Sequence, residues 1–245
     1  MLKHTGARRT HTHNVRLAIL LSLTAGFVNA EGLLGFSTLT TNVTGHAALF
    51  AEYIYSKNWT MAAVVALWML LFLAGAFCSS FIIDLVGEQQ RYAKLVPVTL
   101  EIILLCCISI WAGTYKNLAI ARQVFTGSLL FAMGLQNALV SMISKSVVRT
   151  THLTGTFTDL GIELAKCLFT DPANKPGLLS SIALKLYIIV FFIAGVLGGA
   201  YSFGWLHFHS FFIPAFILVW ALLYDVFRIN AKLAYRNIER TFRTW

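Results

Sequence analysis

Apolar residues gather in six long stretches along this chain, and they do not alternate with polar ones as in a half-buried strand. One of them, Met61 to Ile83, carries no ionisable side chain. A helix needs roughly 20 such residues to cross a bilayer. The pattern therefore predicts an all-α membrane bundle with six spanning helices, at about 17–36, 61–83, 95–113, 124–144, 178–205 and 210–227.

Two further segments, 38–57 and 149–169, are of mixed polarity and too short for comfortable spans. We expect each to form a half-helix or a surface helix. If both crossed the membrane, the chain would have eight spans. That alternative ranks second, because it would place four basic residues outside: Arg91, Lys94, Lys145 and Arg149.

Composition and charge agree with a chain that belongs in lipid. Residues are 58% hydrophobic and 12% charged, and the mean hydropathy is +0.72, whereas a soluble domain is about one quarter charged. The net charge of +9 comes largely from basic residues near the two ends, in 1–14 and 229–245. This distribution indicates cytoplasmic termini that flank a membrane domain at 15–228, and it indicates no nucleic-acid partner.

The first apolar stretch also has features of a signal peptide, with a basic start and small residues at its end near Ala30. Five more apolar stretches follow it. An uncleaved first span is therefore the favoured interpretation.

Four landmarks recur in the same order in the two halves of the chain. Gly-x-x-Asn-Ala and Thr-Thr-x-(Val/Leu)-Thr-Gly are followed by Phe-x-Ala-Gly and then by a proline. They occupy 26–30, 40–45, 72–75 and 97 in one half, and 134–138, 150–155, 192–195 and 214 in the other. We predict two three-span repeats, 15–115 and 122–228, inverted in the membrane because each has an odd number of spans. Transporters of this kind place their site near mid-depth between the repeats.

The Thr-x-x-Thr-Gly pattern after a Gly-x-x-Asn-Ala helix resembles the YoaK-like family of bacterial integral membrane proteins. The resemblance covers about 15–228, and its most specific parts are Thr40–Gly45 and Thr150–Gly161. It implies a six-span protein of the bacterial inner membrane, in a family without an assigned function. The chain departs from its relatives at Asn29, where they often have Asp, and at His46, where they often have Asn.

The repeated polar residues are the candidate binding groups for a small polar or anionic solute. Thr hydroxyls and a turn-forming Gly can contact a ligand, although Thr can equally cap the helix that follows. Asn29 and Asn137 can instead join the two repeats by hydrogen bonds. The full candidate set is Asn29, Thr41, Thr44, Gly45, Gln136, Asn137, Thr151, Thr154 and Gly155.

Three carboxylates are candidates for coupling transport to protons or cations: Glu31, Glu101 and Asp159. Ionisable groups inside a membrane are costly, and are functional hypotheses for that reason. The alternative is that Glu31 and Glu101 lie near helix ends or pair with a lysine. For Asp159, which shares a predicted helix face with Glu163 and Lys166, a solvated face with a local ion pair is the simpler explanation.

No phosphate-binding loop, nucleophile elbow or strong metal motif is present in the sequence. We therefore expect no enzyme and no cofactor, and a transporter that works alone or as a symmetric dimer, driven by a gradient or passive. This hypothesis predicts a polar cavity at mid-depth. The alternative is a non-transporting scaffold or partner subunit, and an intramembrane enzyme ranks last.

Overall fold

The computed structural model describes residues 11–87, 91–144, 148, 150–172 and 174–224, and within these residues all regular structure is helical. Most of the predicted basic tails, together with Lys145 and Arg149, lie outside the described residues. The helices are α1 (His11–Phe36), α2 (Val43–Tyr55), α3 (Trp59–Val86), α4 (Arg91–Tyr115), α5 (Ala119–Ser144), α6 (Leu153–Phe169), α7 (Lys175–Leu206) and the short 3₁₀ helix η2 (His207–Phe211). Residues 212–224 form a further α-helix.

Five helical segments are long and apolar enough to cross a membrane, consistent with a multi-pass membrane protein. They are Val15–Phe36, Trp59–Val86, Ala93–Tyr115, Ala119–Ser144 and Lys175–Tyr224. The two intervening helices, α2 with 13 residues and α6 with 17, are shorter. Large apolar side chains on α3, such as Leu73 and Phe77, point outward and are more than half exposed. Lipid would cover such a surface.

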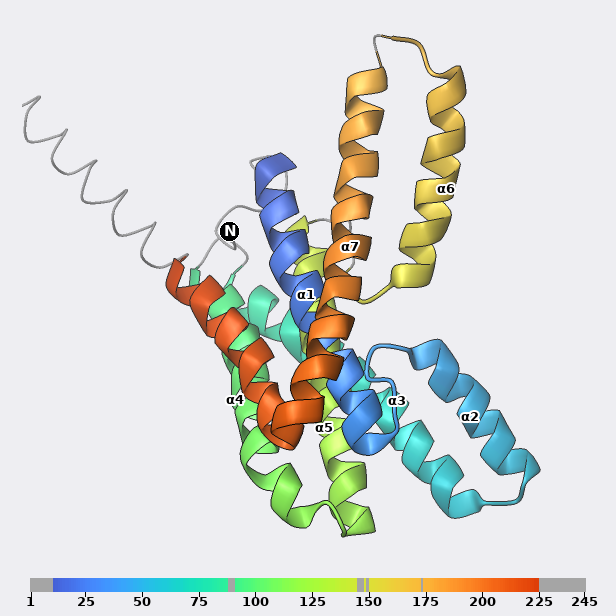
Figure 1. The fold of residues 1–245 in the computed structure, drawn as a ribbon, viewed down its shortest axis with the longest axis vertical. Helices are drawn as coiled ribbons and strands as arrows, with labels where there is room; N and C mark the ends of the chain where they lie inside the picture. Colours follow the sequence, from blue (N-terminus) through green and yellow to red (C-terminus); the bar gives the residue numbers. More distant parts are fainter. Residues whose placement is uncertain (1–10, 88–90, 145–147, 149, 173, 225–245) are drawn as a thin grey trace, which may run out of the picture.

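The last of these segments is 50 residues long, which is more than twice the length of one span. It is broken at His207, whose φ of 47° ends α7 and starts η2. The helix over 212–224 then runs back toward the beginning of α1 (Figure 1), where Nη1 of Arg16 donates to the Tyr224 hydroxyl over 3.4 Å. The fifth and sixth apolar stretches of the sequence therefore form two antiparallel helices.

Two helix pairs form the frame of the bundle, α1 with α7 and α3 with α5. The helices of each pair run parallel. In α1 and α7, Leu23 meets Gly195, and further along both helices Gly35 meets Phe203. In α3 and α5, Met61 meets Gln123 near both starts, and Gly75 meets Phe131 further along. Each pair joins a helix of the first half of the chain to one of the second.

The repeated glycines allow these close approaches. A Cβ atom on Gly26 would collide with the backbone of Phe192, and one on Gly134 would collide with the backbone of Phe72. Both phenylalanines belong to the Phe-x-Ala-Gly motif of the opposite half. Lipid tails are as apolar as leucine, so membrane helices associate through close packing of this kind.

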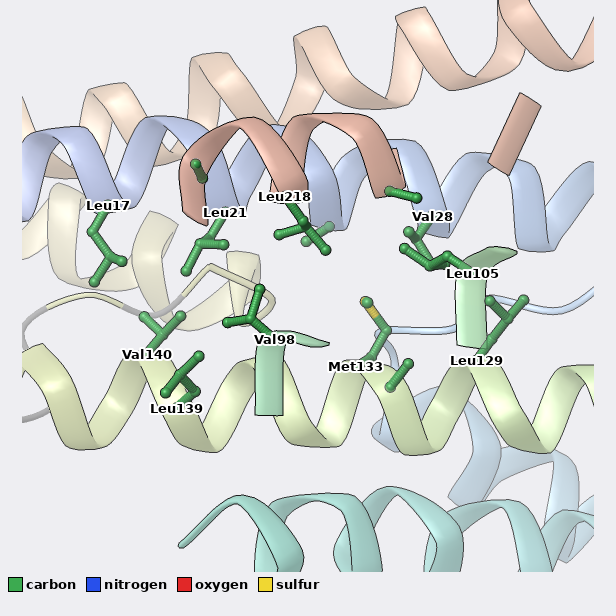
Figure 2. Packing of buried hydrophobic residues seen from close by; sticks show 14 of the residues in the cluster. Leu17, Leu21, Val28, Val98, Leu105, Leu129, Met133, Leu139, Val140 and Leu218 are labelled. Carbon is green, nitrogen blue, oxygen red and sulfur yellow. The ribbon is translucent and has the colours of Figure 1, made fainter. Parts of the chain in front are cut away.

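The centre of the bundle is filled by apolar side chains from several helices (Figure 2). Leu21 and Val28 of α1 face Met133 and Leu139 of α5, and Leu105 of α4 lies in the same layer. All five are almost fully buried. Together with Leu218 of the last helix, they fill the middle of the bundle with apolar side chains.

We predict that alanine at Gly134 destabilises the protein by about 1–3 kcal/mol, because the backbone of α3 must move to admit a methyl group. Thermal unfolding of the purified protein in detergent measures this change. Gly161→Ala on α6 is the matched control, since nothing lies within 4 Å of its added Cβ, and it should be neutral or stabilising by up to about 1 kcal/mol. Equal effects at the two positions would refute this account of the α3–α5 contact.

Candidate functional site

The first Thr-Gly loop is folded back onto its own helix by Asn29. The Oδ1 atom of Asn29 accepts hydrogen bonds from the Thr40 amide at 3.1 Å, the Thr41 amide at 3.3 Å and the Thr41 hydroxyl at 3.0 Å. The Thr40 hydroxyl also donates to the Val28 carbonyl at 3.4 Å. We call these bonds the Asn29 clamp. They bring together the two motifs that the sequence repeats, and they satisfy amides that lie outside any helix.

The second loop has a corresponding clamp. The Thr151 hydroxyl donates to Oδ1 of Asn137 at 2.8 Å, and Nε2 of Gln136 donates to the Thr150 hydroxyl at 3.3 Å. The same Nε2 donates to the Leu21 carbonyl of α1 at 3.0 Å. Gln136 thus anchors its own loop and also crosses to the first half of the chain.

These contacts correct one sequence-based hypothesis. Among the described residues, the side-chain bonds of Asn29 and Asn137 go to threonines of their own half, and none joins the two halves. Next to Asn137, Gln136 does cross to the first half, and its partner there is a backbone carbonyl. A carbonyl acceptor is present at every position of a helix, so the sequence carries no signal for this bond.

Both clamps lie part of the way along their helices. Asn29 precedes the last residue of α1 by seven positions, and Asn137 precedes the last residue of α5 by the same number. At 1.5 Å per residue, each chain therefore returns about 10 Å into the bundle before the next helix begins. In Figure 1, α2 and α6 then run in opposite directions along the long axis of the molecule.

The first turns of α2 and α6 present the remaining repeated residues. Thr44 and Thr154 are exposed, and Gly45 and Gly155 are partly exposed. The threonines do not cap these helices. Oδ1 of Asn42 accepts the Gly45 amide at 3.0 Å, whereas α6 has no side-chain cap. Unpaired N–H groups at such a helix start favour a polar or anionic partner.

Sequence reasoning overlooked Asn42, although Asn three residues before a Gly at a helix start is a recognisable cap. In the second half His152 takes its place, with its ring against Gly155. His46, the other histidine of the repeated loops, is buried instead, with Nε2 placed 2.9 Å from the Leu39 carbonyl.

Glu31 lies on α1 two residues after the Asn29 clamp and is 0% exposed. The hydroxyls of Ser202 and Ser210 lie beside it, but within the described chain neither carboxylate oxygen has a hydrogen-bond partner. Glu101 on α4 is 1% exposed, and its Oε1 is likewise without a partner there. Burying an ionised carboxylate in such surroundings without partners is costly.

The third carboxylate candidate differs from these two. Asp159 is exposed on α6, away from the buried interior. Its neighbour Glu163 forms an ion pair with Lys185 of α7 at 2.8 Å, and Ser181 donates to the same oxygen at 2.8 Å. Lys185 could have been found in the sequence as an ionisable residue inside an apolar stretch. The Glu163 pair ties α6 to α7.

One protein family matches nearly the whole described domain. The model described as "Protein of unknown function (DUF1275)" matches residues 17–224. The chain belongs to this family. Its matched range runs from α1 through the last described helix, so both clamps and both buried carboxylates lie inside the DUF1275 domain. No curated protein and no solved structure matches the chain.

The best-formed cavities among the described residues of the DUF1275 domain lie away from the clamps. Three cavities are lined by described residues, and none of these includes Asn29, Thr41, Asn137 or Thr151. One is an apolar groove between α3, α4 and α5, and the other two lie where α1 and α7 end. The polar mid-depth cavity expected from the sequence is not among them.

We predict that Asn29→Ala lowers the stability of the protein by about 2–3 kcal/mol, because three donors lose one acceptor. Asn137→Ala removes a single bond to Thr151 and should cost about 1 kcal/mol. The apparent Tm in detergent measures both changes, and the hydrogen exchange of residues 38–42 measures the loosening of the first loop in Asn29→Ala. Asn29→Asp keeps an oxygen acceptor and serves as the control. If the Ala and Asp variants at position 29 behave alike, the clamp does not hold the loop.

Proposed function

We propose that this chain is a secondary transporter or facilitator that moves a small polar or anionic solute across the bacterial inner membrane. One observation carries the proposal: two matched loops return into the bundle and start short helices part of the way along their neighbours. Non-helical backbone at membrane depth is tolerated where protein buries it or where it lines a water-filled path. Interrupted helices of this kind hold the substrate in known transporter folds.

The proposed topology has six spans in two inverted three-helix repeats, with both termini in the cytoplasm. The parallel courses of α1 with α7 and of α3 with α5 support it. In the two proposed repeats, α5 corresponds to α1 and α7 corresponds to α3. The contact of α1 with α7 is therefore the counterpart of the contact of α5 with α3. The glycine contacts agree, since Gly26 meets Phe192 where Gly134 meets Phe72.

The solute, in this proposal, binds at the first turns of α2 and α6. Thr44, Thr154 and Gly155 offer hydroxyl and amide groups there that the clamps do not use, whereas the Gly45 amide becomes available only if Asn42 releases it. Asn29, Thr41, Gln136, Asn137 and Thr151 hold the two loops in place and contact the solute only if a clamp opens. The structure described here would then be a conformation closed at the clamps.

Glu31 and Glu101 are the proposed coupling groups, because they are buried carboxylates that lack a full set of partners. A proton bound to either can leave only when water reaches it, and this links protonation to conformation. Asp159 is exposed and lies on the outside of α6, so we give it no more than a subsidiary role at the membrane surface.

A second candidate function, a non-transporting partner subunit, is favoured by the dry packing of the clamps. The Thr44 and Thr154 side chains would then face another protein and not a solute. The chain could meet a second copy of itself through this surface. The two functions differ in whether a ligand that binds the purified protein also crosses a membrane.

We predict that the α2–α3 and α6–α7 turns lie on opposite faces of the membrane. In a background without the four native cysteines, Ser56→Cys should react with a membrane-impermeant maleimide in intact cells. Asp171→Cys should react only after lysis. Reaction of both from the outside would exclude the inverted arrangement and, with it, this form of the proposal.

We predict that at least one solute from a panel of amino acids, carboxylates, phosphate and alkali cations raises the apparent Tm and undergoes counterflow in proteoliposomes. The double variant Thr44→Ala, Thr154→Ala should weaken binding about tenfold, the loss expected from about 1.4 kcal/mol of polar contacts. Glu31→Gln should still bind the solute but lose the response of transport to a pH gradient.

Thr99→Ala is the control for these variants, because Thr99 is exposed on α4 and its hydroxyl bonds only its own helix. A ligand that binds but shows no counterflow would favour the partner-subunit function. Unchanged transport in the double variant would remove the two helix starts from the site.

A further inference from the structure

A basic pocket lies at the end of the bundle where α1, α4 and α7 finish. It has a volume of about 460 Å³, within the range of small-molecule sites. Its polar wall consists of Lys116, Asn117, Arg122, His207 and His209, from the α4–α5 connection, the start of α5 and η2. No acidic residue is among the described residues that line it.

The charges of this pocket are gathered without a compensating carboxylate in its lining. Lys116 and Arg122 are the cationic side chains of the pocket, and the two histidines add ring nitrogens that can donate hydrogen bonds. Like charges held at one place repel each other, and a bound anion offsets that repulsion. On the topology proposed above, the pocket faces outward, where lysine and arginine are generally scarce.

The start of α5 adds to this positive field. The Arg122 amide donates to the Leu118 carbonyl, four residues earlier. It is the first amide of α5 to form the usual helical bond. The amides of 119–121 come before it, at the positive end of a helix of 26 residues. Asn117, which precedes this turn, lines the pocket. Helix starts of this kind bind anionic groups through their N–H groups.

Two aromatic rings form part of the pocket wall. Phe203 and Phe208 line the pocket and meet edge to face with ring centres 5.4 Å apart, and Phe36 lies 5.3 Å from Phe208. Gly35 makes room for these rings, because a Cβ there would press on both Phe203 and Phe208. Glu31 lies one helical turn before Gly35 and is not among the described residues that line the pocket.

We propose that this pocket binds a small oxyanion, a phosphate or carboxylate group, between Lys116, Arg122 and the two histidines. The group belongs either to a free solute or to an anionic lipid head, and both present the same chemistry to the site. The proposal does not require transport, since it depends only on the lining of the pocket.

The test is calorimetric titration of the purified full chain in neutral detergent with potassium phosphate, against potassium chloride at the same ionic strength. A second arm titrates mixed micelles that contain phosphatidylglycerol, against micelles with phosphatidylcholine. The double variant Lys116→Gln, Arg122→Gln should bind at least about tenfold more weakly, because each lost charge-assisted bond is worth about one decade or more. Lys57→Gln is the matched control, an exposed lysine at the α2–α3 turn outside the pocket.

Each outcome decides the proposal. Phosphate binding that the double variant loses and Lys57→Gln keeps supports a site for free oxyanions. Binding of phosphatidylglycerol alone, with the same variant pattern, supports a lipid-head site. Binding in neither arm, or equal binding by the double variant and the unmodified chain, overturns the proposal. The apparent Tm without ligand shows whether each variant is folded. If the double variant loses phosphate binding but still transports the solute, this pocket and the proposed solute site are different sites.

Discussion

The arrangement of the whole bundle depends on the need to satisfy backbone groups that leave a helix inside an apolar environment. A loop that returns about 10 Å into lipid-covered protein carries amides that cannot reach bulk water, and each unsatisfied one is costly. Asn29 meets this need for Thr40 and Thr41 with a single oxygen atom. In the second half the clamp acts on side chains instead: Gln136 donates to the Thr150 hydroxyl, and Asn137 accepts from the Thr151 hydroxyl.

The clamps also explain why the frame is built from glycine contacts. Each clamp asparagine follows its helix-packing glycine by three residues, one turn along the same face: Gly26 with Asn29, and Gly134 with Asn137. The glycine draws a helix of the opposite half to van der Waals contact, which fixes the helix at the depth where the asparagine must receive its loop. Packing and loop placement are therefore set by one five-residue motif in each half.

Much of this could be predicted from the sequence, because hydrophobic length and repeated motifs are local signals. All six apolar stretches appear as helices, as far as the residues are described, and 38–57 and 149–169 contain the short helices α2 and α6. The site was less predictable. The partner of Gln136 is a backbone carbonyl, and the break at His207 depends on a positive φ in a residue that gives no sign of it. The link from Glu163 to Lys185 joins residues 22 apart, which helical spacing alone does not bring together.

The differences between the halves carry more functional information than their likeness does. Aligning the glycine motifs places Glu31 opposite Leu139 and Gln136 opposite Val28, and aligning the two prolines places Glu101 opposite Leu218. All six side chains are buried, so burial is common to both halves whereas polarity is not. A duplicated frame needs only the shared glycines, asparagines and threonines to fold. The carboxylates add no such support, since part of their hydrogen-bonding capacity is unused in the described structure. A group that is costly to bury, absent from the equivalent position and without a full set of partners among the described residues does not contribute to stability. For that reason Glu31 and Glu101 are our proposed coupling groups.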